Sequence, residues 1–143
     1  FNSIEEIERV LDKGLIPDLI QVPYNILDTR YETYMKELKE KYGTEIHTRS
    51  TFLQGLFFMD PMNLSSFFDP IKEWLNQIQN SELSGRLLQF VVSKKFIDKV
   101  VVGVNNHLQL HENLSALTEN LEPLLKINFS VPSDIIIPSN WPK

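Results

Sequence analysis

A polar turn after a short apolar segment is the part of this sequence best suited to hold a ligand. A candidate strand covers Glu45–Thr48. The polar residues Arg49, Ser50 and Thr51 come directly after it. Backbone amides and a hydroxyl group at the carboxyl end of a strand can bind a phosphate group. A buried strand followed by an ordinary surface turn is the alternative, and this stretch alone does not decide between the two.

A glutamine inside an apolar segment is a second candidate. The run Leu19–Val22 does not alternate between polar and apolar residues, which predicts a strand buried on both faces. Gln21 lies within this run, and an unpaired buried amide costs about 1–3 kcal/mol. Its side chain is therefore expected either to satisfy a structural hydrogen bond or to face a ligand near the carboxyl end of the strand.

Two histidines have the spacing of metal ligands on one helix face. His107 and His111 are four residues apart, but no third ligand is evident, and structural zinc sites use four ligands. The chain has no cysteine, which excludes disulfides and thiolate metal sites. We therefore expect no metal site.

Composition limits the class of protein. The 143 residues are enough for one domain with a hydrophobic core, and no apolar run is long enough to span a bilayer. The net charge of -5 argues against nucleic acid or an anionic membrane as the main partner. We expect a single domain over residues 1–143 and a cytoplasmic location, with which the lack of cysteine is compatible. The start at Phe1, without Met or a signal-peptide pattern, predicts a chain cut from a longer one.

Capping residues and apolar periodicity predict helices between the candidate strands. The expected helices are Ile4–Lys13 after a capping box at Ser3, a second from the capping box Thr29–Glu32 to Gly43, a third with Asp69 as its N-cap and Pro70 as its first residue, and a fourth over Glu82–Ser93. A fifth helix, capped by Asn106, is expected to carry Leu110, Leu114, Leu117 and Leu121 on its inward face. A third strand is expected at Lys99–Gly103, and the tail Ile127–Lys143 is expected to wrap onto the body. The apolar connection Leu56–Phe68 is interpreted as a lid or a packing segment, with a partner-binding patch as the alternative.

Repeated strand–helix units predict an α/β fold with three parallel strands and flanking helices. A complete (β/α)8 TIM barrel takes about 250 residues, so the chain has the units for part of such a barrel.

Three blocks of the sequence resemble the C-terminal part of the aldo/keto reductase family. Asp18–Asn25, continuing to Asp28, resembles the sixth barrel strand, and Glu45–Gly55 resembles the seventh strand and its loop. Val100–Leu114 resembles the eighth strand and the helix with a Gln/Arg-x-x-Glu-Asn signature. The tail Pro138–Trp141 also resembles family tails. The resemblance covers essentially the whole chain and implies a single C-terminal half-barrel, with Phe1 just after the fifth strand.

This resemblance implies a parent enzyme that moves a hydride between NADP or NAD and a small carbonyl substrate. The catalytic Tyr, Lys, Asp and His of the family come from its first four strands, which are absent from this chain. We therefore expect no catalytic residue here, and Tyr24, Tyr31, His47 and Lys99 are not taken as replacements.

The same resemblance assigns cofactor-binding positions. Gln21 corresponds to the residue that binds the nicotinamide carboxamide, and Arg49 stands where an aromatic residue usually stacks on the nicotinamide. The pyrophosphate loop would contain Ser50, Phe52 and Gly55, with Thr51 in place of a common proline, and the adenosine end would be held by Gln109, Glu112 and Asn113.

The expected cofactor preference follows from positions where this sequence differs from the family, and the expected partners follow from the barrel strands that it lacks. Members that bind the NADP 2′-phosphate tightly have basic residues at the positions of Gly103 and Gln109, so we expect NADH to serve as well as NADPH, or weak binding. A half-barrel has open sheet edges, which predicts pairing with an N-terminal barrel half or with a second copy. A non-catalytic half-barrel that acts by such association remains the alternative to the reductase fragment.

Overall fold

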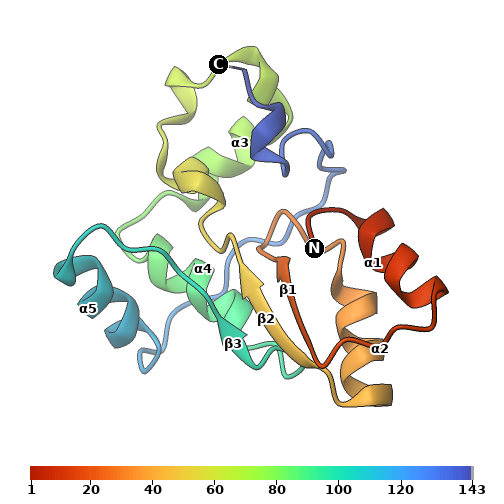
Figure 1. Ribbon diagram of the computed structural model, residues 1–143. Helices are drawn as coiled ribbons and strands as arrows, with labels where there is room; N and C mark the ends of the chain where they lie inside the picture. The colour runs from red at the N-terminus through yellow and green to blue at the C-terminus, as the bar shows by residue number, and fades with distance from the viewer. Residues whose placement is uncertain (143) are drawn as a thin grey trace. The chain divides into compact units, whose positions relative to one another are not determined.

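The computed structural model describes residues 1–142 (Figure 1). The described residues form two compact units. The first contains Phe1–Thr51 and Val91–Gly103, and the second contains Phe52–Phe90 and the chain from Val104 onward. All three strands lie in the first unit, whereas the second unit consists of helices, turns and an extended tail.

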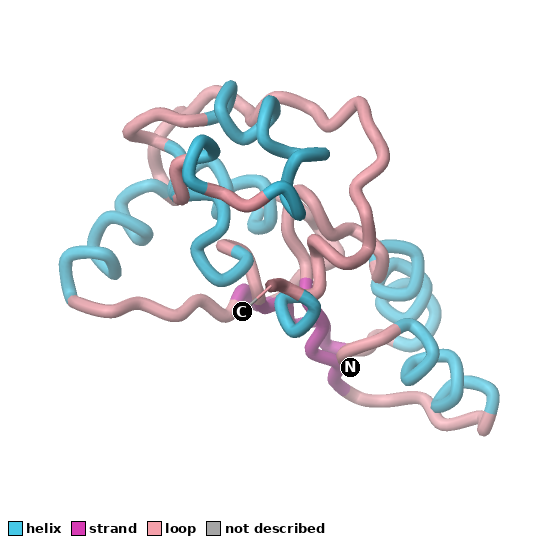
Figure 2. The backbone as a smooth tube through the Cα atoms, turned by 90° about the horizontal axis from the view of Figure 1, so that it is seen from above, coloured by secondary structure: helices cyan, strands magenta, loops and turns pink. Residues whose placement is uncertain are grey.

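The first unit is built on a parallel sheet of three strands, β1 (Leu19–Pro23), β2 (Glu45–Arg49) and β3 (Lys99–Val100), in that order. Helices α1 (Ile4–Asp12) and α2 (Glu32–Tyr42) belong to the same unit. The strands lie side by side in the ribbon of Figure 1, and Figure 2 marks them in magenta on the backbone tube. An α/β fold with three parallel strands and flanking helices, as expected from the sequence, is therefore confirmed.

The two faces of this sheet differ in polarity. Ile20 and Val22 of β1 are buried, as are Ile46 and Thr48 of β2, whereas Leu19 is 45% exposed and Gln21 is exposed. The expectation that β1 is buried on both faces is therefore wrong. Because successive side chains of a strand point to opposite faces, the run is a half-buried strand with one open face.

The third strand is shorter than expected. Its pairing with β2 joins His47 to Lys99 and Thr48 to Val100, and Val101 N–H donates to Thr48 O at 2.8 Å. The chain of β2 turns away after Arg49, because Ser50 adopts a left-handed backbone with φ 65°. The residues after Val101 therefore have no β2 partner, and the expected strand to Gly103 stops at Val100.

Helix α2 packs against β2 and buries Met35 and Leu38. It ends at Gly43, whose left-handed φ of 70° is a conformation that glycine adopts readily. The expected capping box at its start is wrong, because the helix begins at Glu32 after the uncapped Tyr31. The Glu32 carboxylate is used instead by the Tyr24 hydroxyl and by Lys36.

The second unit contains α3 (Asp69–Ile78), α5 (His107–Ala116) and most of α4 (Leu83–Val92), whose last two residues belong to the first unit. Three α4 residues fix its contact with the α5 region. A Cβ added at Gly85 would lie 2.8 Å from the Ala116 Cβ, so the two segments meet there at a close approach. Arg86 donates to the Glu122 and Pro123 carbonyls, and Gln89 donates to those of Ala116 and Glu119.

The burial of α5 differs from the expected pattern. Leu110, Leu114 and Leu117, which we call the α5 leucine face, are 43%, 57% and 43% exposed. The helix instead buries Asn113 and Ala116. The prediction that these three leucines point inward is wrong, because Ala116 is the α5 residue that approaches Gly85 of α4. Leu121, the fourth leucine of the predicted face, lies beyond the end of α5 and also approaches Gly85.

The apolar connection and the tail of the second unit are partly packed. Leu56, Phe57 and Phe68 are buried, whereas Phe58, Met59 and Met62 are exposed. The Phe57 ring meets the Trp74 ring edge to face, and the Phe68 ring meets that of Trp141. In the tail, Ile135 and Ile136 are buried and the Trp141 indole donates to the Ile135 carbonyl at 2.9 Å. The expected wrapping tail is present in the residues that the structure describes.

Within residues 1–142, none of the helices has the length and apolar character that a membrane crossing requires.

Candidate functional site

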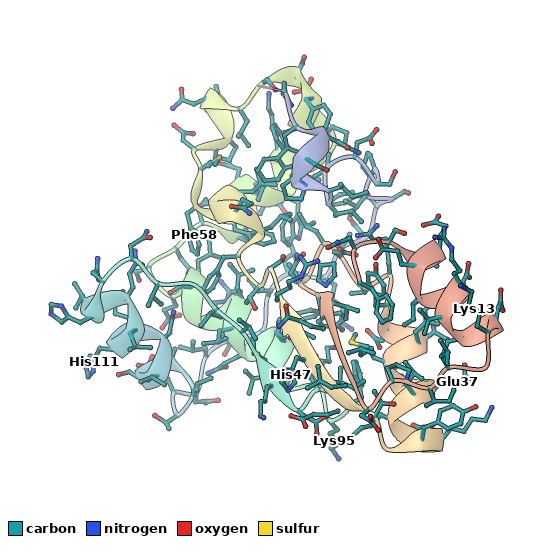
Figure 3. The ribbon with its side chains drawn as sticks, viewed as in Figure 1. Lys13, Glu37, His47, Phe58, Lys95 and His111 are labelled. Carbon is teal, nitrogen blue, oxygen red and sulfur yellow. The ribbon has the colours of Figure 1, made fainter. Side chains whose placement is uncertain are left out.

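The carboxyl ends of β1 and β2 carry the first group of predicted ligand-binding residues. Gln21 pairs with His47 across the two strands, and Pro23 pairs with Arg49. Gln21, His47 and Arg49 therefore share the open face of the sheet, on which Figure 3 marks His47. Because ligands of parallel sheets bind outside the carboxyl ends of the strands, this edge is a suitable place for a ligand.

Arg49 is held in place by neutral oxygen atoms. Its Nη2 donates to the Asn2 side-chain oxygen at 2.6 Å and to the Phe1 carbonyl at 3.2 Å. Its Nη1 donates to the Ser50 hydroxyl at 3.3 Å. The Phe1 nitrogen in turn donates to the backbone carbonyl of Gln21 at 2.8 Å, so the segment Phe1–Asn2 contacts both Gln21 and Arg49. Nothing in the sequence pattern singled out Asn2 for this contact.

Asn25 fixes the turn that follows β2. Its side chain is fully buried, and its Oδ1 accepts from the amides of Leu27 and Asp28 at 2.9 and 3.0 Å. Its Nδ2 donates to the Ser50 carbonyl at 3.0 Å. Asparagine commonly bonds to backbone amides two residues further on, so the turn after β1 was recognisable, but the bond to Ser50 was not. Asn25 therefore holds the backbone next to the candidate site, a contact that the sequence reasoning missed.

The loop between Ser50 and Gly55 contains several residues with a left-handed backbone conformation. Among residues 1–142 the non-glycine residues with positive φ are Ser50, Leu53 and Gln54, at 65°, 43° and 54°. Gly55 follows with φ 82°. Left-handed backbone is costly for residues with a side chain and clusters at ligand sites. The ring of Phe52 packs against that of Phe58, with centroids 5.6 Å apart, and this contact anchors the start of the loop.

The third group lies at the start of α5. Asn106 caps the helix by accepting from Gln109 N–H at 2.9 Å, as its sequence position predicted. The Gln109 side chain accepts from Asn105 N–H at 2.8 Å. Glu112 is exposed, whereas Asn113 is buried at 7% exposure. Gln109, Glu112 and Asn113 therefore lie on adjacent turns of α5.

The predicted residues are divided between the two units. Gln21, Arg49 and Ser50 belong to the first unit, and Phe52, Gly55, Gln109, Glu112 and Asn113 belong to the second. Within the first unit the structure brings Gln21 and Arg49 onto one sheet face. Within the second unit it places the three α5 residues on adjacent turns.

Glu45 and Lys99 form an ion pair beside His47 on the open sheet face. Glu45 Oε1 lies 2.8 Å from Lys99 Nζ and 2.7 Å from His47 Nε2. Lys99 and, to a lesser extent, His47 lower the pKa of the Glu45 carboxyl, and Glu45 raises the pKa of Lys99. Both side chains are engaged in this network, which gives His47 and Lys99 a structural role.

The two tyrosines of the first unit are buried. Tyr24 donates to Glu32 at 2.7 Å, and burial together with this bond raises its pKa. Burial raises the pKa of Tyr31 to about 12, and its hydroxyl has no hydrogen-bond partner among the described residues. Burial therefore favours the neutral form of both phenols.

The histidine pair on α5 is exposed. His107 and His111 both face solvent, and Figure 3 shows His111 projecting from the helix. Within residues 1–142, no three His, Asp or Glu side chains gather in a group that could hold a metal ion.

Comparisons with known proteins give a fold. No family model matches the sequence, and no curated protein sequence matches it. Two solved structures of aldo-keto reductase AKR11C1 from Bacillus halodurans are similar to the chain. The holo form has a TM-score of 0.64 at 22% identity over 87% of this chain, and the apo form has 0.64 at 19% identity over 97%. The chain spans about half the length of these structures, 44% and 49%. It therefore has the fold of part of an aldo-keto reductase barrel.

Proposed function

We propose that this chain is the C-terminal, cofactor-binding portion of an NAD(P)H-dependent aldo/keto reductase, which reduces a carbonyl to an alcohol in the full-length parent. The barrel-type fold and the order of the three sequence blocks support this assignment. The parent binds a nicotinamide cofactor and a small carbonyl substrate, and the catalytic residues come from its other half. A cytoplasmic location is part of the same proposal.

The observation that carries the proposal is the backbone of the loop after β2. Three non-glycine residues with positive φ fall within five positions, in the segment that the resemblance assigns to the pyrophosphate. Successive amides in such turns form concave sites for anions, and strained backbone persists where function requires it. An ordinary surface turn would have no reason to keep left-handed Ser50, Leu53 and Gln54.

Gln21 offers the sharpest test of the cofactor site. In the natural full-length polypeptide, Gln21→Leu removes the amide predicted to bind the carboxamide, whereas Gln77→Leu makes the same change at an exposed position of α3. Loss of one hydrogen bond predicts about two- to tenfold weaker NADH binding for Gln21→Leu alone. Equal NADH affinities of Gln21→Leu and Gln77→Leu would show that Gln21 does not bind the cofactor. An absence of carbonyl-dependent oxidation of NADH or NADPH by the wild type would contradict the reductase assignment.

The α5 leucine face favours a second candidate, a non-catalytic half-barrel that acts by association. Leu110 and Leu114 of α5 and its C-cap residue Leu117 are each more than two-fifths exposed. Self-association through this face predicts a mass in light scattering that rises with concentration and falls back to the monomer in Leu114→Lys. A monomer over a wide concentration range would contradict this candidate.

A further inference from the structure

We propose that Thr51 is an additional phosphate-binding residue of the cofactor site, in which its backbone amide, oriented by Asn25, and its hydroxyl group both donate to a phosphate oxygen. The inference rests on the proposed function, because it names a ligand group of the same cofactor. It also assigns a role to the position where the resembled family commonly has a proline.

Thr51 has polar groups that the protein leaves without partners. Its Oγ1 is buried and lacks a hydrogen-bond partner, and the whole residue is 2% exposed. No acceptor for its backbone N–H is found among residues 1–142 either. A buried polar group without a partner is costly and uncommon in native structures. An acceptor brought by a ligand removes this cost for both groups.

The orientation of the Thr51 amide is set by Asn25. The Asn25 amide group holds the Ser50 carbonyl at 3.0 Å, and the side chain is itself fixed by bonds from Leu27 and Asp28. No peptide bond in the described chain is cis, so the N–H of Thr51 points away from the Ser50 carbonyl. Asn25 therefore turns this N–H away from the β1 turn, and Asn25 acts as a positioning residue.

The chemistry of Thr51 suits an oxyanion. A hydroxyl and an amide that both donate match a phosphate oxygen, which accepts several hydrogen bonds. A proline at this position has no N–H and no hydroxyl, so this ligand contact is specific to a chain with threonine here.

A matched pair of valine substitutions tests the proposal. Thr48, on the buried face of β2, also has a buried Oγ1 without a partner among the described residues. Thr51→Val and Thr48→Val remove the same atom from similarly buried sites and keep the shape. Neither is expected to lower the midpoint of thermal unfolding, because each removes an unsatisfied hydroxyl. Only Thr51→Val is expected to weaken binding of NADH, by about tenfold or more, since a hydrogen bond to a charged group is lost.

The ligands used as probes locate the contact. In the natural full-length polypeptide, ADP-ribose, which has the pyrophosphate without the nicotinamide, should lose as much affinity as NADH in Thr51→Val. Thr51→Ser, which keeps the hydroxyl, should restore affinity for both. Unchanged NADH affinity in a folded Thr51→Val, with wild-type binding intact, would overturn this inference alone. If the wild type binds neither NADH nor NADPH, both this inference and the proposed function are overturned. If Thr51→Val alters only the KM for the carbonyl substrate, Thr51 contacts the substrate rather than the cofactor, and the inference is overturned.

Discussion

Replacing Asp98 with alanine is expected to destabilise the first unit by removing one carboxylate that joins three elements. Asp98 Oδ2 accepts from the Ile46 amide of β2 at 2.7 Å, and its oxygens lie 2.6 and 2.8 Å from Lys39 Nζ on α2. Ile46 is completely buried, so its amide would lose its acceptor in a dry environment. Asp98 itself immediately precedes β3, and the bonds therefore tie α2, β2 and the start of β3 together.

The two lost interactions contribute unequally. An unsatisfied buried amide costs about 1–3 kcal/mol. The Asp98 and Lys39 side chains are each 32% exposed, and a pair exposed to that degree contributes about 0–1 kcal/mol. The sum predicts a loss of about 1–4 kcal/mol in the free energy of unfolding, centred on the amide term. This is a large part of the roughly 5–15 kcal/mol that stabilises a typical protein.

Urea unfolding of wild type, Asp98→Ala and Asp98→Asn measures this loss. Asparagine keeps an oxygen for the Ile46 amide and loses only the charge, so it should retain most of the stability. The amide of Ile46 and then Lys39 lower the pKa of Asp98, so the stabilisation is present above the unfolded-state pKa and is lost as the pH falls through the folded-state pKa. The gap between wild type and Asp98→Ala should therefore close in acid. Equal stability of wild type and Asp98→Ala near neutral pH would refute the reasoning.

Three further predictions concern packing and the site. Gly85→Ala should destabilise the protein by about 1–3 kcal/mol in urea unfolding, because its methyl group would lie 2.8 Å from the Ala116 Cβ, and adding Ala116→Gly should restore part of the loss. Asn25→Ala should lower the free energy of unfolding by about 3 kcal/mol, since three hydrogen bonds are lost. It should also weaken NADH binding, because the Ser50 carbonyl loses its donor. Unchanged NADH affinity of the folded variant in calorimetric titration would show that Asn25 has no role in the site. Gln109→Arg should raise the ratio of NADPH affinity to NADH affinity about tenfold, because it adds a charge-assisted bond to the 2′-phosphate; an unchanged ratio would contradict this.

The helices of the second unit illustrate what sequence periodicity can predict. The α3 residues Ile71, Trp74, Leu75 and Ile78 repeat at helical spacing and are all buried in the structure. The leucines of α5 repeat in the same way, yet three of them are exposed. Periodicity predicts that an apolar face exists, but it does not say which face meets a neighbour. Here the close approach of Gly85 to Ala116 decides the orientation, and no local pattern in α5 encodes that contact.

The strands show a similar limit. The sequence predicted that β1 is apolar. Because the exposed residue Leu19 is itself apolar, the sequence did not show the alternation of buried and exposed residues that leaves Gln21 on an open face. The end of β3 depends on where β2 turns away, which is a property of Ser50 rather than of the valines themselves. Around the site, the left-handed conformation was foreseeable for Gly55 and not for Leu53 or Gln54. Their conformation is set by the turn as a whole, so residue type alone could not reveal it.

The most direct test of the proposed function is a calorimetric titration of the natural full-length polypeptide with NADH and, separately, with NADPH. The cofactor-binding assignment predicts saturable binding of one dinucleotide per chain, with similar affinities for the two because Gly103 and Gln109 supply no cation for the 2′-phosphate. Absence of binding by either dinucleotide at millimolar concentration, from a protein shown to be folded, would contradict the assignment and favour the half-barrel that acts by association.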